Sequence, residues 1–301
     1  MKIAVTGGSG FIGGQIASEL AKSHEVVSID IAPPNKAEGF SFHPADLSSY
    51  ETTEKVLKNV DVVYHVAGAV LEQVRMNPFM ASGTNVEITR NVVEASYKNG
   101  VKKILFASTF YVYDGIDPNM TVNEATPLST IGMELFGATK VFGETLLKEY
   151  SKKYGMKYVI LRFGSAYGPG GQGSNVIKAF LDSAKAGKAI DVWGPGNRRN
   201  QYTYVKDLAK GSVLSLSREN EIYNLISPEE TTIKELTETI SKKVPTKVQF
   251  DLGKKEGASM PYMSSRKAIK ELGWTTISVD EGIDLILSHD HGEKLLAAEA
   301  A

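Results

Sequence analysis

Three glycines at three-residue spacing follow an apolar segment at the amino end of the chain. Gly7, Gly10 and Gly13 lie in TGGSGFIGG, residues 6–14, directly after the apolar segment 2–7. Such glycines permit a tight strand-to-helix turn, a close approach of the backbone to a pyrophosphate, and close packing of the helix on the sheet. The free N–H groups of the following helix, which Phe11 and Ile12 open, attract the anion. The spacing therefore predicts a dinucleotide site.

One carboxylate ends the next apolar segment, residues 25–30. Asp30, followed by Ile31, is predicted to accept hydrogen bonds from the adenosine ribose hydroxyls. Its negative charge would repel the 2′-phosphate of NADP. The pattern therefore predicts NAD as the cofactor.

The segments that position these residues alternate between strand-like and helix-like patterns. We predict strands at 2–7, 25–30, 60–68, 102–109 and 157–163, and helices at 11–21, 50–58, 85–98 and 133–154. This alternation predicts an α/β fold, with a Rossmann doubly wound parallel sheet that carries helices on both faces.

The pattern changes after the last of these strands. Loop-forming YGPGG and WGPGN runs and short mixed segments indicate a smaller mixed α/β C-terminal substrate lobe, placed at the carboxyl ends of the strands where ligands bind. We predict an NAD-binding Rossmann domain at 1–163 with 205–225 returning to it, a substrate-binding lobe at 164–204 and 226–291, and a tail at 292–301.

Composition narrows the possible partners. The 301 residues carry a formal net charge of −1 and no cysteine, so no disulfide or thiolate metal site is expected, and no metal is predicted. The charge balance gives no reason to expect nucleic acid or a membrane as a partner. No targeting segment or run of about 20 apolar residues is visible, which predicts a soluble, cytoplasmic protein.

Further motifs follow the glycine turn in a fixed order. They are the Asp46-Leu47 pair, HVAGA at 65–69, Asn85 at the start of a predicted helix, Thr109 before Val112-Tyr113, GATK at 137–140, LRFGSAYGPG at 161–170 and RKAIKELGW at 266–274. Together they resemble the extended short-chain dehydrogenase/reductase family, in its NAD-dependent nucleotide-sugar epimerase/dehydratase branch. The resemblance covers residues 1–274. It implies that the cofactor site also includes Asp46, Leu47, Val66, Ala67, Gly68, Asn85, Lys140 and Phe163.

The same resemblance implies a catalytic tyrosine four residues before Lys140, with Thr109 and Ser108 supplying a hydroxyl to the substrate oxygen. This chain has Phe136 at the tyrosine position, and phenylalanine has no proton to exchange. Three interpretations stay open. Phenylalanine replaces the tyrosine in a disabled, substrate-trapping variant; another phenol, Tyr111 or Tyr113, serves instead; or the protein binds without chemistry.

The residues after Thr109 separate the reactions of the family. Its dehydratases and decarboxylases are expected to carry carboxylic acids where this chain has Phe110-Tyr111. The resemblance therefore favours an epimerase that oxidises a sugar carbon transiently. The alternatives are an NAD-dependent dehydrogenase or reductase of a smaller alcohol or ketone, and a non-catalytic NAD(H)-binding sensor or scaffold.

The substrate end departs from the family pattern at several positions. Ser165 stands where the family has an asparagine, and Asn200 where it has an arginine. Substrate contacts are predicted for Ser165, Asn175, Lys254 and Arg199, with Arg198 as the other candidate arginine. A nucleotide-linked sugar is predicted as substrate. A homodimer is implied by the resemblance. His65, Trp193 and Trp274 are predicted to pack in the interior.

Overall fold

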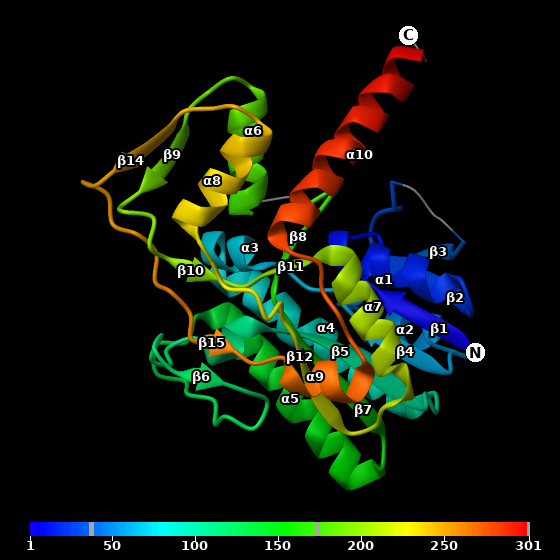
Figure 1. Ribbon diagram of the computed structural model, residues 1–301. Coiled ribbons are helices and arrows are strands. Elements are labelled where there is room, and N and C mark those ends of the chain that lie inside the picture. Colours follow the sequence, from blue (N-terminus) through cyan, green and yellow to red (C-terminus); the bar gives the residue numbers. More distant parts are fainter. Residues whose placement is uncertain (36–38, 172–174, 300–301) are drawn as a thin grey trace.

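Seven parallel strands form the central sheet of the computed structural model, which describes residues 1–35, 39–171 and 175–299 (Figure 1). Their spatial order is β12 (Glu221–Leu225), β7 (Lys157–Phe163), β5 (Lys103–Thr109), β4 (Val62–His65), β1 (Lys2–Thr6), β2 (Glu25–Asp30) and β3 (Ser41–Pro44). Each neighbouring pair is parallel, so helices must cross over between strands. The predicted Rossmann-type α/β fold is confirmed.

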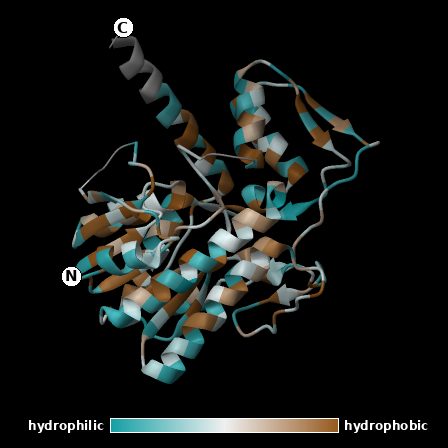
Figure 2. Ribbon diagram, turned by 180° about the vertical axis from the view of Figure 1, so that it is seen from behind, coloured by the Kyte–Doolittle hydropathy of each residue, from teal (hydrophilic) through white to brown (hydrophobic). Residues whose placement is uncertain are grey.

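Helices cover both faces of this sheet. One face carries α1 (Phe11–Ala21), α7 (Val205–Leu214) and α9 (Arg266–Leu272), and the other carries α2 (Tyr50–Val56), α4 (Pro78–Lys98) and α5 (Leu135–Tyr154). Val5 and Val159 pack in the first core, and Ala4 and Ile160 in the second. Successive residues of one strand therefore point to opposite faces, which explains the continuous apolar runs. Figure 2 shows these hydrophobic residues gathered on the strands and the inner faces of the helices.

The structure differs from the predicted elements at three places. The edge strands β3 and β12 were not predicted, and the helix expected at 85–98 begins at Pro78, after the separate short helix α3 (Leu71–Met76). The Asn77 side chain caps α4 by accepting a hydrogen bond from Met80 N at 3.2 Å. Phe79 and Met80 are exposed, so the apolar periodicity that marks a buried helix face begins only later.

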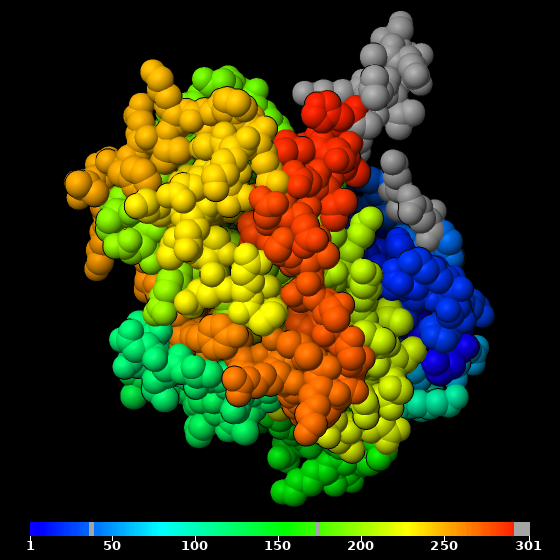
Figure 3. All heavy atoms as spheres, in the orientation of Figure 1, coloured from blue at the N-terminus to red at the C-terminus, as the bar shows by residue number. Residues whose placement is uncertain are grey.

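The second lobe has its own hydrophobic core. Its elements, with the connecting ones, are η1 (Phe110–Tyr113), β6 (Thr121–Val122), β8 (Ser165–Tyr167), α6 (Val176–Lys185), β9 (Ile190–Trp193), β10 (Arg199–Asn200), β11 (Tyr202–Tyr204), η2 (Ser215–Ser217), β13 (Thr231–Thr232), α8 (Ile233–Lys243), β14 (Val248–Asp251), β15 (Tyr262–Met263) and α10 (Val279–Glu299). Side chains of α6, α8 and α10 share one cluster. Figure 3 shows α10, in red, between the yellow surface of α8 and the blue surface of amino-terminal residues.

The chain crosses between the two regions more than once. β12 joins the central sheet, and Trp274 packs in the first core against α7, where its indole N–H donates to Asp207 O at 2.8 Å. Trp274 is therefore interior, as predicted. The predicted tail at 292–301 continues α10 as far as Glu299, and 300–301 lie outside the described residues. Among the described residues, no helix combines the length and apolar character that crossing a membrane requires.

Candidate active site

The glycine-rich turn joins β1 to α1 in a conformation that fits a dinucleotide phosphate. Gly7 has φ of +70°, and a Cβ atom added there would lie 2.6 Å from Ala67 N. A Cβ atom added at Gly13 would lie 2.1 Å from the Gly7 carbonyl oxygen. Gly10 caps α1 without a side-chain acceptor, so the N–H groups of the first turn stay available to an anion. This uncapped turn is the feature that NAD would occupy.

The first residues of α1 line the same turn. Phe11 and Ile12 are half-buried. A Cβ atom added at Gly171 would lie 3.4 Å from the Phe11 ring, so the YGPGG loop of the second lobe approaches the glycine turn here.

The carboxylate of Asp30 lies beside this turn. It accepts hydrogen bonds from Ser9 N at 3.1 Å and from Ile31 N at 2.8 Å. Asp30 therefore links the end of β2 to the glycine turn, where a ribose would lie. Ile31 is 77% exposed, so its side chain is free to cover an adenine.

The Asp46-Leu47 pair follows β3 at the same edge of the sheet. Asp46 accepts a hydrogen bond from Ser48 N at 2.9 Å, and this bond lowers the pKa of Asp46. The Leu47 side chain is buried, and its carbonyl accepts from Asn91 Nδ2 at 3.0 Å. A buried polar side chain thus fixes the backbone on which the pair lies.

The end of β4 forms the floor of the site. Val66 N donates to Thr6 O at 3.1 Å, which continues the pairing with β1. Asn85 holds Ala69 on both sides, accepting from its N–H at 2.6 Å and donating to its carbonyl at 3.1 Å. A Cβ atom added at Gly68 would lie 3.0 Å from Asn85 Oδ1 and 3.6 Å from Lys140 Nζ. Lys140 therefore reaches the floor beside the glycine turn.

Lys140 is a buried cation in the middle of the site. Burial lowers the pKa of its ammonium to about 8. Its Nζ lies 5.2 Å from the centroid of the Phe106 ring, and no group in the part of the chain that the structure describes accepts a hydrogen bond from it. Such an unpaired cation suits an external acceptor such as a ribose hydroxyl.

His65 belongs to the core beneath Lys140, as predicted. Its ring nitrogens contact Thr6 Oγ1 at 2.8 Å and Thr89 Oγ1 at 3.2 Å. Burial, followed by the charge of Lys140, lowers the pKa of His65 to about 3. A neutral, fully hydrogen-bonded imidazole of this kind is a structural group.

Phe136 lies one helical turn before Lys140, on the first turn of α5. Its ring meets the Tyr111 ring edge to face, with centroids 6.0 Å apart and planes at 77°. Thr109 ends β5 beside them, and its hydroxyl oxygen accepts from Tyr111 N at 3.3 Å. The predicted catalytic positions Thr109 and Phe136 thus both contact Tyr111, and Lys140 lies over Phe106 of β5.

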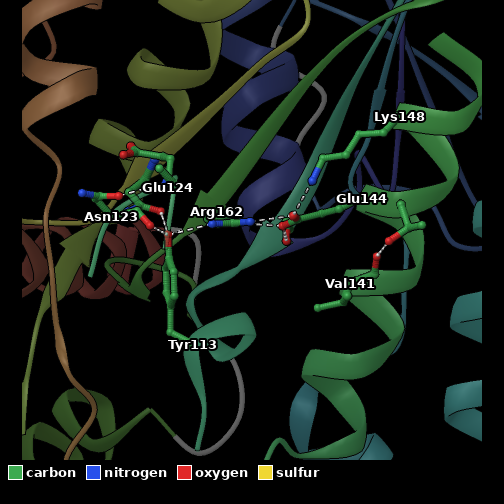
Figure 4. Close-up of polar contacts among 11 residues, drawn as sticks. Tyr113, Asn123, Glu124, Val141, Glu144, Lys148 and Arg162 are labelled. Carbon is green, nitrogen blue, oxygen red and sulfur yellow. Dashed lines mark hydrogen bonds and ion pairs between the residues drawn. The ribbon is translucent and has the colours of Figure 1, made fainter. Parts of the chain in front are cut away.

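Ser108 faces a different environment from Thr109. Its hydroxyl donates to Glu144 Oε1 at 2.7 Å, inside a buried network with Arg162 and Tyr113 (Figure 4). Arg162 donates to both Glu144 oxygens, at 2.9 and 2.7 Å, and to the Tyr113 hydroxyl at 2.7 Å. This side of Ser108 is therefore used to hold α5 against β5 and β7.

Sequence reasoning missed Glu144 and Arg162. A signal was present, because Glu144 lies four residues after Lys140 on the same helix and the arginine lies in the LRFG segment. Two ionisable residues that each fall on an apolar stretch suggest a buried ion pair. The partner of each became visible only when the elements packed together.

The predicted substrate residues have partners within the chain. Phe163, a predicted cofactor residue, ends β7 beside Thr109, its partner across the two strands, and the predicted substrate residue Ser165 follows in β8. Asn175 caps α6 by accepting from Ile177 N at 2.9 Å and donates to Ala166 O at 2.5 Å. These contacts are the ones that a helix cap requires.

The two candidate phosphate-binding arginines, Arg198 and Arg199, have different surroundings. Arg199 pairs with Glu230 at 3.3 Å and donates to Pro118 O at 3.0 Å. The charge of Arg198 instead acts on Tyr111, next to Phe136. Of the two, Arg199 is thus held by an ion pair and a backbone hydrogen bond within the chain.

Lys254 lies on the surface of the second lobe. Its Nζ is 3.4 Å from Asp251 Oδ2 and 5.1 Å from the centroid of the Trp193 ring. Trp193 is 59% exposed, so the prediction that it packs in the interior is wrong. The strand β9 alternates buried and exposed residues, and Trp193 falls in the exposed register.

The fold and this site define a Rossmann-type dinucleotide-binding protein with a second lobe over the carboxyl ends of its strands. The family model for the NAD dependent epimerase/dehydratase family matches residues 3–225. The chain belongs to this family, whose cofactor is NAD.

Relatives match over nearly the whole chain. A Methanocaldococcus jannaschii protein whose name proposes UDP-glucose 4-epimerase activity is 30% identical, over 95% of this chain and 97% of its own. The Thermotoga maritima UDP-glucose 4-epimerase, solved with UDP-glucose, has a TM-score of 0.88 at 25% identity and covers 97% of this chain and 99% of its own. The Thermus thermophilus UDP-glucose 4-epimerase, solved with NAD, has a TM-score of 0.85 at 27% identity, with the same coverage.

Proposed function

We propose that this chain is an NAD-dependent epimerase that acts on a nucleotide-linked sugar by transient oxidation at a sugar carbon. The proposal is supported mainly by the position of Lys140, whose Nζ would lie 3.6 Å from a Cβ atom added at Gly68, next to the Ala67 backbone that the glycine turn touches. Ligands of open α/β sheets bind at this end of the strands. The substrate class rests on the relatives, two of which are UDP-glucose 4-epimerases of known structure.

Each residue of the site has a distinct part in this proposal. NAD, when bound, accepts a hydride from the sugar carbon and can return it to the opposite face. Asp30 would accept hydrogen bonds from its adenosine ribose, and Lys140 would donate to its nicotinamide ribose. Thr109, whose hydroxyl ends β5, would hold the reacting sugar oxygen. Ser165, Asn175, Arg199 and Lys254 stay predictions for the substrate end.

The residues after Thr109 favour epimerisation over elimination. Phe110 and Tyr111 carry no carboxyl group, and dehydration or decarboxylation in this family is expected to use one there. Stoichiometric release of NADH during turnover would favour the alternative, a dehydrogenase of a smaller alcohol or ketone.

Phe136 identifies the change that tests the proposal. Restoring the phenol with Phe136→Tyr should raise kcat/KM by about 10²- to 10⁴-fold, because that is the usual contribution of a positioned general acid or base. The measurement is the interconversion of UDP-glucose and UDP-galactose with NAD present.

Phe79→Tyr, at an exposed position of α4, is the matched control and should leave the rate unchanged. If both the unaltered chain and Phe136→Tyr bind NAD and the nucleotide sugar but neither interconverts UDP-glucose and UDP-galactose, the epimerase proposal is wrong. That result would favour the second candidate, an NAD(H)-binding protein without chemistry, which the missing hydroxyl at position 136 motivates. A homodimer and a cytoplasmic location stay predictions.

A further inference from the structure

Two tyrosines lie close to Phe136, and either could supply the phenol that position 136 lacks. Tyr111 and Tyr113 are two residues apart in η1, directly after Thr109. Because they lie on one short turn, they point in different directions and have different surroundings. A catalytic role for either tyrosine rests on the proposed function.

The Tyr113 hydroxyl is not accessible to a substrate. Tyr113 is fully buried, and its hydroxyl contacts Arg162 NH1 at 2.7 Å, Asn224 Oδ1 at 2.9 Å and Asn123 O at 3.0 Å. Figure 4 shows the Tyr113 hydroxyl held between Arg162 and Asn123. A hydroxyl that already donates and accepts in the interior has no capacity for a sugar oxygen.

Tyr111 has the opposite character. It is half-buried, and among residues 1–35, 39–171 and 175–299 no group hydrogen-bonds its hydroxyl. Its ring contacts Phe136 edge to face. A Cβ atom added at Gly137 would lie 2.5 Å from the Tyr111 carbonyl oxygen, so the backbone of η1 is pressed against the first turn of α5. The Tyr111 ring is therefore held against Phe136, the residue that lacks the hydroxyl.

Charged groups surround the Tyr111 ring. Burial raises the pKa of this phenol above its ordinary value; the charges of Arg75 and Arg198 lower it, and those of Glu134 and Asp114 raise it. Arg75 is held in place by both oxygens of Glu134, at 2.9 and 2.5 Å. Burial is the largest of these effects, and Glu134 opposes the arginine with which it pairs, so the net result is a raised pKa and a protonated phenol at neutral pH.

We infer that Tyr111 is a catalytic residue that exchanges the sugar hydroxyl proton in place of a tyrosine at position 136. In the oxidation step, which starts from the deprotonated Tyr111 phenolate, the sugar O–H bond breaks and its proton forms the phenol O–H bond of Tyr111. The hydrogen on the same carbon leaves with its electron pair to oxidised NAD, which is the co-reactant, and a C=O bond forms. In the reverse step the hydride would return from reduced NAD to the opposite face of that carbon, the C=O bond would become a C–O single bond, and the proton would return from Tyr111 to the sugar oxygen, which regenerates the phenolate.

The test combines two substitutions in four proteins: the chain as it is, Tyr111→Phe, Phe136→Tyr and the double variant. With saturating UDP-glucose, Tyr111→Phe should lower kcat about 100-fold or more when residue 136 is phenylalanine. In the Phe136→Tyr background the same change should cost less than about threefold, because the restored phenol replaces Tyr111. Equal losses in both backgrounds would overturn the inference.

Two further readouts separate catalysis from packing. The kcat of the unaltered chain should rise with pH above neutrality, because the phenolate is the proton acceptor, and this rise should be absent from Tyr111→Phe. By calorimetry, Tyr111→Phe should weaken UDP-glucose binding about fivefold, the value of one net hydrogen bond, and leave UDP binding unchanged. A loss of affinity for both ligands would indicate a packing defect instead.

Tyr97→Phe, on the exposed side of α4, is the matched control for removing one phenol oxygen and should change none of these quantities. If Phe136→Tyr raises turnover but Tyr111→Phe has no effect on the unaltered chain, the inference fails and the epimerase proposal stands. If none of the four proteins converts UDP-glucose, both fail.

Discussion

The cofactor end and the catalytic end of the cleft lie at the same edge of one sheet, but different kinds of atoms define them. At the cofactor end, backbone atoms approach each other so closely that a Cβ atom at Gly13 would lie 2.1 Å from a carbonyl oxygen. At the catalytic end, the half-buried side chains of Phe136 and Tyr111 meet edge to face. Substitutions change side chains and leave backbone atoms in place, so the cofactor end changes only if the fold changes. The catalytic end can change its chemistry through a single substitution, since tyrosine and phenylalanine differ by one oxygen atom.

The largest effect should come from filling the backbone contact at the cofactor end. Gly13→Ala should weaken NAD binding by up to about 100-fold, because the added methyl group forces the glycine turn open and overpacking of this kind costs about 1–3 kcal/mol. Isothermal titration with NAD measures the loss.

Gly14→Ala is the matched control in the same helix, since its added Cβ would lie 3.5 Å from its nearest neighbour, an ordinary contact. Equal NAD affinity in the two variants would contradict the view that this turn is the cofactor site. Thermal melting of both proteins separates lost binding from lost folding.

A smaller effect is expected where the cofactor end depends on one side chain. Asp30→Asn should weaken NAD binding about tenfold, because a charged acceptor contributes about 1.5–3 kcal/mol per hydrogen bond. It should also narrow the preference for NAD over NADP, since the repulsion of the 2′-phosphate is removed. Fluorescence titration with NADH and NADPH measures both.

Asp61→Asn serves as the control at the amino ends of the strands, away from the glycine turn, where the Asp61 carboxylate accepts a hydrogen bond from Lys2 N at 2.9 Å. If Asp30→Asn and Asp61→Asn bind the two cofactors alike, Asp30 does not contact the ribose.

The smallest expected effect concerns Lys140, which lies between the cofactor end and the catalytic end. Because burial lowers the pKa of Lys140 to about 8, the ammonium is present below that pH and is lost as the pH rises through it. NAD affinity should therefore fall about fivefold between pH 7 and 9, the value of about one net hydrogen bond. The dependence should be absent from Lys140→Met. A pH-independent affinity in the unaltered chain would show that the cation does not contact the cofactor.

The features that could be predicted from the sequence are those that depend on residues close together in the chain. The glycine turn, Asp30 and the alternation of strands and helices were visible because φ angles, side-chain periodicity and charge depend on residues close in the chain. The edge strands β3 and β12 were missed, because a short edge strand is specified by the neighbour that it pairs with.

The sequence by itself determined the fold class, the place of the cofactor turn and the absence of a hydroxyl at position 136. Only the tertiary structure decided that Ser108 is hydrogen-bonded to Glu144 and that Arg199 pairs with Glu230. It also decided that the Tyr113 hydroxyl is hydrogen-bonded in the interior, whereas the Tyr111 hydroxyl has no hydrogen-bond partner among the described residues. The reason is physical. A side chain chooses among donors and acceptors that come from distant segments, and those choices exist only after the helices and strands have packed.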